Sequence, residues 1–268
     1  MKQLSIAFSP CPNDTFVFHA MLHGLVDTRG FTFKPYIDDV ETLNQKAFSE
    51  EFHVSNLSFA AYLELRDKYD LLDSGAALGY GCGPLVVTRQ PNVDLGSGKI
   101  AVPGQYTTAN LLFKLWHKGS SNIEYTAFDN IMSGVENGKY SAGVIIHEGR
   151  FVYRNYNLVK IVDLGEWWEK ETGMPIPLGC IAVRKDNGTI KYKDDIESII
   201  ASSVRYAFGN RSASRDFVKS YSQELDDKVI DSHIDLYVNE FTLSLGENGR
   251  EAVRVLRDMM GGKEYPHP

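Results

Sequence analysis

The chain is poor in cysteine. Its 268 residues include only Cys11, Cys82 and Cys180, which are odd in number, widely spaced and not part of any Cys-x-x-Cys pair. The pattern therefore indicates neither a disulfide framework nor a zinc knuckle, because both need paired or closely spaced thiols. Reduced thiols of this kind are typical of a cytoplasmic protein, and we expect that location.

Long apolar runs and an excess of positive charge are also missing. A membrane span needs about 18 apolar residues in a row, and no window approaches that length. The alternating segment 4–8 ends before Pro10 and is too short for the apolar region of a signal peptide. The net charge of -7 argues against binding to nucleic acid or to an anionic membrane. We expect neither partner, and the sequence leaves a homodimer open.

The composition is that of a globular protein, with 43% hydrophobic and 24% charged residues. Over residues 1–85, patterns of short strands alternate with patterns of short helices. Strands are predicted at 4–8, 31–37 and 53–55, and helices at 40–48, at 58–65 and after a cap at Asn13 or Asp14. This alternation is typical of parallel βαβ units and predicts an α/β fold.

The same alternation returns after a turn rich in glycine and proline at 79–84. Strands are predicted at 99–102, 124–128, 142–146 and 179–184, helices at 107–117 and 131–137, and further helices from about residue 192. The chain should therefore fold into two lobes with a ligand cleft between them. We assign 1–88 and 185–268 to lobe one, which is discontinuous, and 89–184 to lobe two.

Ligands of open parallel sheets bind beyond the carboxyl ends of the strands, where the next helix begins. This rule selects the loops 9–14, 55–58, 103–108 and 147–148. His147 is the strongest catalytic candidate, because a histidine held at the end of an apolar strand can act as a base near neutral pH. A hydrogen-bonded structural histidine would fit the same position.

Polar residues in the other loops also have two interpretations. Thr107 and Thr108 either line a carboxylate site or simply cap a helix, and Ser58 has the same ambiguity. Cys11 is better explained as a packed thiol than as a nucleophile, because no histidine is its neighbour in the sequence. The acidic run that contains Glu41 is typical of a solvated helix start.

Cofactor motifs are weak. The glycines at 79–83 lack the full Gly-x-Gly-x-x-Gly spacing and precede a strand, which disfavours dinucleotide binding. His19 and His23 have the spacing of metal ligands on a helix, but no third ligand accompanies them. Surface or core positions explain these two histidines better than a metal site does.

Several segments, in order along nearly the whole chain, resemble 1,4-dihydroxy-6-naphthoate synthases of the futalosine route to menaquinone. They are 9–16 (SPCPNDTF), 39–44 (DVETLN), 83–87 (GPLVV), 103–104 with 107–109 (PG and TTA), 145–148 (IIHE) and 175–179 (PIPLG). The resemblance implies a fold like that of type II periplasmic binding proteins. It also implies a lyase that converts cyclic dehypoxanthine futalosine to 1,4-dihydroxy-6-naphthoate with neither a metal nor an organic cofactor.

The resemblance assigns roles to individual residues. It implies that His147 is the proton acceptor, and that Thr108 and Ala109 form one substrate-binding segment. A second substrate-binding segment comprises Asn56, Leu57 and Ser58. Members of the family often have lysine at the position of Asn56, and here an amide or backbone contact is expected in place of a charge contact. The expected partner is a small substrate with a carboxylate, and from its position we add Thr107 to the binding residues.

Two other functions fit the same fold. A chorismate dehydratase of the same pathway would be distinguished by its consumption of chorismate. A non-catalytic small-acid-binding protein would bind its ligand tightly without turnover, although such proteins need export or a membrane partner.

Overall fold

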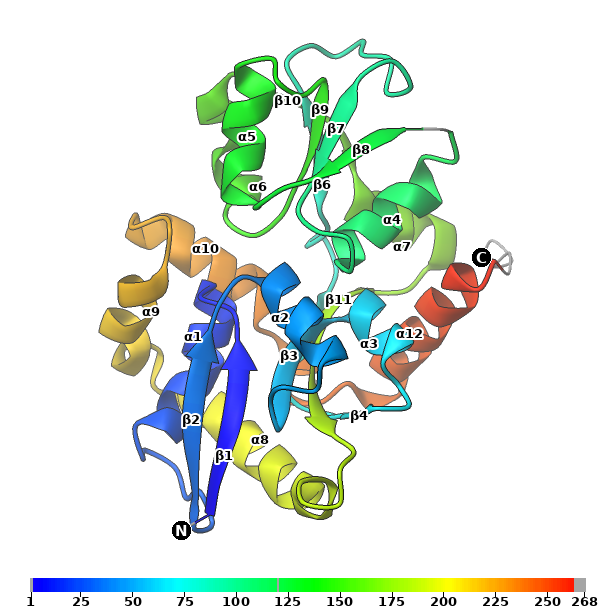
Figure 1. Cartoon of the computed structure of the whole chain (residues 1–268). Coiled ribbons are helices and arrows are strands. Elements are labelled where there is room, and N and C mark those ends of the chain that lie inside the picture. Colours follow the sequence, from blue (N-terminus) through cyan, green and yellow to red (C-terminus); the bar gives the residue numbers. More distant parts are fainter. Residues whose placement is uncertain (1, 120, 263–268) are drawn as a thin grey trace.

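The structure is a computed structural model that describes residues 2–119 and 121–262. These residues form two β-sheets with helices packed on them, and Figure 1 shows the sheets in separate lobes. The chain crosses between the lobes twice, so the first lobe contains both the beginning and the end of the described chain. The arrangement confirms the two-lobed α/β fold predicted from the sequence.

Lobe one is built on the larger sheet. Its strands are β1 (Lys2–Phe8), β2 (Phe31–Ile37), β3 (Val54–Ser58), β4 (Tyr69–Leu71), β5 (Ala77–Gly79) and β11 (Ile176–Arg184). The strand order is β2-β1-β3-β11-β4, and β5 pairs with β11. β1 is parallel to β2 and β3, as βαβ connections require, whereas β11 is antiparallel to its neighbours.

Lobe two is built on the smaller sheet. Its strands are β6 (Leu85–Thr88), β7 (Lys99–Val102), β8 (Asn122–Tyr125), β9 (Ala142–Ile145) and β10 (Val159–Asp163). The order is β10-β6-β9-β7-β8. β7 is parallel to β8 and β9, and β6 is antiparallel to β9 and β10. The carboxyl ends of β7 and β9 therefore meet at the edge of the sheet that faces lobe one, where the cavity described below lies.

Sheet membership corrects the predicted lobe boundaries. β6 pairs within lobe two although we assigned 1–88 to lobe one, and β11 pairs within lobe one although we assigned 89–184 to lobe two. The two crossings consequently lie near 80–84 and 173–175. Each boundary is displaced by one strand, because the hydrophobic pattern of a strand does not specify which sheet it joins.

The helices alternate with strands early in the chain and dominate its end. They are α1 (Pro12–Leu22), α2 (Val40–Phe48), α3 (Phe59–Glu64), α4 (Thr108–Trp116), α5 (Asp129–Glu136), α6 (Gly149–Val152), α7 (Leu164–Thr172), α8 (Lys193–Gly209), α9 (Arg215–Tyr221), α10 (Asp227–Tyr237), α11 (Glu240–Leu243) and α12 (Gly246–Met260), with short 3-10 helices at Tyr153–Tyr156, Ile190–Tyr192 and Arg211–Ser214. α1 packs against α8, α9 and α10. No helix among the described residues is both long and apolar enough to cross a membrane.

The first helix begins earlier than predicted. Cys11, rather than Asn13 or Asp14, is the N-cap residue of α1, and Pro12 occupies the first helical position. Proline suits that position because its missing N–H would have no partner there. The carboxylate of Asp14 instead accepts hydrogen bonds from the backbone N–H of Ser9 at 3.1 Å and from its hydroxyl at 2.7 Å. These bonds fix the loop between β1 and α1.

Candidate functional site

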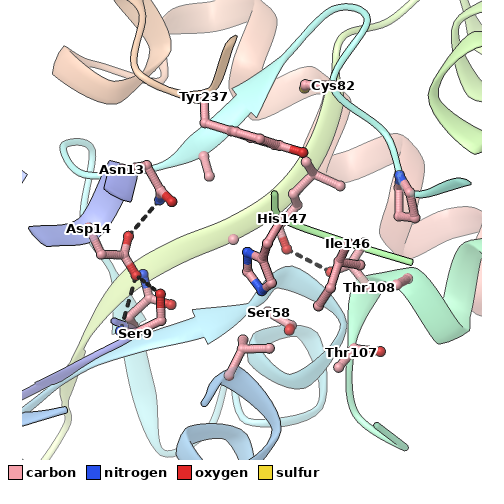
Figure 2. Close-up of a pocket in the computed structure, with 17 residues that line it drawn as sticks. Ser9, Asn13, Asp14, Ser58, Cys82, Thr107, Thr108, Ile146, His147 and Tyr237 are labelled. Carbon is pink, nitrogen blue, oxygen red and sulfur yellow. Dashed lines mark hydrogen bonds between the residues drawn. The ribbon is translucent and has the colours of Figure 1, made fainter. Parts of the chain in front are cut away.

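A cavity open to solvent lies between the lobes, and its empty space, including the open mouth, is about 650 Å³ (Figure 2). The strand ends of both sheets, the start of α4 and the end of α10 form its wall. The lining residues are Ser9, Asn13, Asp14, Val40, Asn56, Ser58, Ala77, Cys82, Pro84, Thr107, Thr108, Ala109, Ile146, His147, Leu178, Gly179 and Tyr237. All four loops predicted from the strand-end rule contribute to this lining, and the last of them contributes His147.

Nearly all of the predicted site residues meet at this cavity. Those that line it are Asn56, Ser58, Thr107, Thr108, Ala109 and His147. Leu57 does not line it and is completely buried, because successive side chains of a strand point to opposite faces. The side chain of Leu57 therefore belongs to the hydrophobic core, and the prediction that it binds substrate is not supported for its side chain.

His147 is presented by a sharp turn between β9 and α6. Its backbone has φ of 55°, in the left-handed region that residues other than glycine rarely adopt. Figure 2 shows its imidazole in the middle of the lining residues, and the ring of Phe128 lies edge-on at a centroid distance of 5.1 Å. Strained residues of this kind persist where the surrounding structure holds them, and they cluster at functional sites.

The closest polar partner of His147 comes from the other lobe. The Sγ atom of Cys11 lies 3.1 Å from Nδ1 of His147, within hydrogen-bonding distance for sulfur. The two residues are 136 positions apart, so no local motif links them. The prediction that Cys11 is packed is confirmed, since it is 4% exposed. The argument that Cys11 has no histidine partner was, however, wrong, because the partner is distant in the sequence.

The cysteine and histidine form a neutral pair. Burial raises the pKa of the Cys11 thiol well above its ordinary value, and the nearby carboxylates of Glu148 and Asp14 raise it further. Burial also lowers the pKa of His147 to about 4. The environment therefore disfavours a thiolate–imidazolium pair, which a nucleophilic cysteine would need. What the site offers at neutral pH is an uncharged imidazole.

Behind this pair lies a buried polar network. The side chain of Asn13 donates to Asp14 at 2.7 Å, and its Oδ1 atom lies 2.9 Å from Nε2 of His233. His233 is completely buried, and its Nδ1 lies 3.9 Å from a carboxylate oxygen of Glu148. Burial raises the pKa of Asp14 to about 6 and that of Glu148 to about 7. Two carboxyl groups that titrate near neutrality thus adjoin the cavity.

The hydroxyl groups at the start of α4 are bonded within the protein. Thr107 is the N-cap, accepting from the backbone N–H of Asn110 at 3.1 Å, as the sequence predicts. The Thr108 hydroxyl connects the lobes, because it accepts from the N–H of Ala60 at 3.2 Å and donates to the carbonyl of Leu178 at 2.8 Å. Thr108 therefore ties α4 to lobe one in addition to lining the cavity.

Glu41 is a second connection between the lobes. Its carboxylate accepts hydrogen bonds from the backbone N–H groups of Gln105 and Tyr106, each at 3.0 Å. Glu41 is 9% exposed, so the expectation of a solvated helix start was wrong for this residue. These two N–H groups precede the N-cap Thr107, so the Glu41 carboxylate lies before α4 and does not bond the N–H groups of its first turn, at Thr108 and Ala109.

A family profile described as "Menaquinone biosynthesis" matches residues 4–261. The chain belongs to this menaquinone-biosynthesis family. Two relatives, from Thermus thermophilus and Streptomyces coelicolor, are each 45% identical to it and carry the name 1,4-dihydroxy-6-naphtoate synthase. The alignments cover 94% of this chain and 92% and 91% of those proteins. The resemblance found in the sequence is confirmed, and the chain is an enzyme of menaquinone biosynthesis.

Solved structures share the fold of this chain. Protein AF1704 from Archaeoglobus fulgidus superposes with a TM-score of 0.92 and 36% identity over 97% of both chains. A Candida albicans gene product with the generic periplasmic binding protein fold matches with a TM-score of 0.67 and 10% identity, covering 99% of this chain and 92% of its own. The second likeness shows the fold alone. It confirms the periplasmic-binding-protein-like architecture of this family member.

One group of side chains at the site has donors suited to a metal ion. The thiol of Cys11, the imidazole of His147 and the carboxylate of Glu148 place their ligand atoms within 4.8 Å of one another. Sulfur, nitrogen and oxygen donors together suit zinc better than magnesium or calcium. Binding would require loss of the thiol proton, and it would occupy the same histidine that a base-catalysed reaction needs free.

The protonation of His147 can be measured directly. Because burial lowers its pKa to about 4, we expect its ring C–H resonances to shift with a midpoint near pH 4. An exposed histidine titrates near pH 6.5. A proton NMR titration would follow the signal, which is identified by its loss in His147→Ala. A midpoint at or above pH 6 would show that the ring is not desolvated as described.

Glu148 should make the stability of this enzyme depend on pH. Its folded-state pKa of about 7 exceeds the ordinary 4.5, so its contribution to stability is full below pH 4.5 and is lost as the pH rises through 7. Glu148→Gln cannot ionise and should be more stable than the wild type at pH 8 by about 2 kcal/mol. Urea unfolding at pH 5 and pH 8 would test this. An equal effect of the substitution at both pH values would contradict it.

Thr108 offers a test of the contact between the lobes. Thr108→Val leaves the buried N–H of Ala60 without its partner, which should cost about 1–3 kcal/mol of stability. Thr107→Val should cost about 1 kcal/mol through loss of the cap. We expect Thr108→Val to weaken substrate affinity about tenfold, and more than Thr107→Val does. Urea unfolding and ligand titration of both variants test this prediction. If Thr108→Val lowers the stability of the protein but not its affinity for the substrate, the role of Thr108 is purely structural.

Proposed function

We propose that the protein is a carbon–carbon lyase that converts cyclic dehypoxanthine futalosine to 1,4-dihydroxy-6-naphthoate, with His147 as the general base. The observation that carries this proposal is the neutral imidazole of His147, held by a strained turn inside a cavity between the lobes. The names of the 45% identical relatives support the product. We place the reaction in the cytoplasm.

The proposed reaction begins with proton removal. His147 accepts the proton of a substrate hydroxyl, and the resulting oxyanion forms a carbonyl as the adjacent carbon–carbon bond breaks. The electron pair of that bond passes into the carbocycle, which becomes aromatic as the naphthalene product forms. Aromatisation supplies much of the driving force. The main tasks of the protein are therefore to position the base and to exclude water, rather than to activate a strong electrophile.

Substrate recognition would rely on dipoles rather than on cations. None of the described residues that line the cavity is lysine or arginine. A substrate carboxylate would therefore be held by N–H groups of the first turn of α4, at Thr108 and Ala109, and by the hydroxyl of Ser58. Ser58 accepts from the side chain of Asn44 at 3.1 Å, which leaves its own O–H available to donate. Asn56, on the same face of β3, adds an amide.

Three incubations distinguish this function from its alternatives. The purified protein is mixed in turn with cyclic dehypoxanthine futalosine and with chorismate, and the products are identified by mass. We expect 1,4-dihydroxy-6-naphthoate from the first and unchanged chorismate in the second. In the third, the affinity of the protein for each of these two compounds is measured, without analysis of products. Consumption of chorismate would indicate the dehydratase, and tight binding of either compound without turnover would indicate a small-acid-binding protein.

A further inference from the structure

Cys11 occupies a position that the proposed reaction does not explain. Its Sγ lies 3.1 Å from Nδ1 of His147 and it comes from the opposite lobe. It is almost completely buried and does not line the cavity, so it does not meet the substrate. As the N-cap residue of α1 it makes no side-chain capping hydrogen bond. Its side chain is therefore not needed to start the helix, and its polar partner is the imidazole.

The contact determines which ring nitrogen is available to a ligand. A neutral imidazole carries one proton, on Nδ1 or on Nε2, and only the nitrogen without the proton can act as a base. Because Nδ1 is occupied by Cys11, Nε2 is the nitrogen that can reach a molecule in the cavity. His147 can serve as the base only if its resting proton lies on Nδ1, pointing at the sulfur.

The surrounding charges favour that tautomer. The carboxylate of Glu148 has an oxygen within 4.8 Å of both the sulfur of Cys11 and a ring nitrogen of His147, and Asp14 is a second negative group that acts on the sulfur. His233 stacks on the His147 ring at 6.3 Å and Tyr237 packs on His233, but neither adds a positive charge. Negative potential behind the sulfur attracts protons toward it. The N–H of the imidazole is therefore drawn to Nδ1, and the S–H is drawn toward Glu148.

We propose that Cys11 is a positioning residue that accepts the Nδ1–H of His147 and so keeps the Nε2 lone pair directed at the substrate. The proposal rests on the function proposed above. In the reaction, Nε2 takes the substrate proton, the ring becomes a cation with a proton on each nitrogen, and the Nδ1–H···S contact strengthens. The proton on Nε2 is then returned to the product, which restores the neutral ring. Loss of the correct tautomer is costly in other enzymes that use histidine as a base.

The test compares two variants of Cys11 with a control. Cys11→Ala removes the acceptor, and Cys11→Ser keeps a group that can accept and donate. Cys180→Ala deletes another fully buried cysteine, on β11, whose side chain belongs to the hydrophobic core. We expect Cys11→Ala to lower kcat about 10-fold to 100-fold with KM within about twofold, Cys11→Ser to recover most of kcat, and Cys180→Ala to keep wild-type turnover.

Nitrogen NMR of the histidine-labelled protein supplies a readout that does not depend on activity. We expect the wild-type His147 ring to be protonated at Nδ1, and Cys11→Ala to move the proton wholly or partly to Nε2. A wild-type proton on Nε2, or an unchanged tautomer or kcat in Cys11→Ala, would overturn the proposal. A wild-type protein that does not convert the substrate would instead overturn the proposed function, and the tautomer would still decide the role of Cys11.

Discussion

Replacing His147 by alanine should lower turnover of cyclic dehypoxanthine futalosine by about 10²-fold or more, while the protein still folds and binds the substrate. General acid–base groups contribute about 10²-fold to 10⁴-fold. The ring is the only part of His147 that alanine removes, and it lies inside the cavity rather than in the hydrophobic core. Loss of the base should therefore appear in kcat and kcat/KM together, with little change in affinity.

The control for this variant is another histidine outside the cavity. His23 is exposed near the end of α1, where its ring packs on Phe217. His23→Ala also removes an imidazole, but it should leave kcat unchanged. Steady-state kinetics and a substrate titration of both variants decide the matter. Wild-type turnover in a folded His147→Ala protein would exclude this histidine from the mechanism and direct attention to the carboxyl groups of Asp14 and Glu148.

Replacing Arg150 by alanine should cost about 3–5 kcal/mol of stability, because it leaves a buried carboxylate without its charge partner. Arg150 binds the carboxylate of Asp163 at 2.5 Å and the carbonyl of Gly83 at 2.6 Å. The side chain of Asp163 is completely buried and also caps α7 through the N–H groups of Gly165 and Glu166. One arginine thus secures both a helix start and the first crossing between the lobes.

A surface ion pair provides the comparison for Arg150. Arg29 bonds Asp195 at 2.8 Å with both side chains close to half exposed, so Arg29→Ala should cost no more than about 1 kcal/mol. Urea unfolding of the two variants under the same conditions measures the difference. A loss of less than about 1 kcal/mol for Arg150→Ala would contradict the role of Arg150 as the charge partner of Asp163.

Local patterns in the sequence predicted much of the secondary structure. The residues 31–37, 40–48 and 99–102 form the elements predicted for them, with the same bounds, because periodicity and capping are local properties. The strand predicted at 179–184 begins three residues earlier than expected, because β11 starts at Ile176. Its pairing with β5 shifts register between Pro177 and Gly179, an irregularity that accommodates the proline. Tertiary contacts determine which strands pair in a sheet, and the hydrophobic pattern of a single strand does not predict those contacts.

The candidate site was predicted in outline but not in its contacts. The strand-end rule located His147, Ser58 and Thr108, since it depends only on strand direction and helix starts. The rule could not show that Cys11 meets His147, because that contact joins the two lobes. Glu41 was misjudged for the same reason. Its sequence neighbours are charged, but its carboxylate is buried against backbone N–H groups that lie more than sixty positions away.

The proposed reaction breaks a carbon–carbon bond of the substrate with His147 as the base. A single-turnover reaction tests it most directly, with protein in excess over cyclic dehypoxanthine futalosine and the mixture sampled by mass spectrometry. We predict that the wild-type protein converts all of the substrate to 1,4-dihydroxy-6-naphthoate, and that His147→Ala, at the same concentration, leaves the substrate bound and intact over that time. Intact substrate recovered from the wild-type protein, or equal conversion by both proteins, would contradict this account.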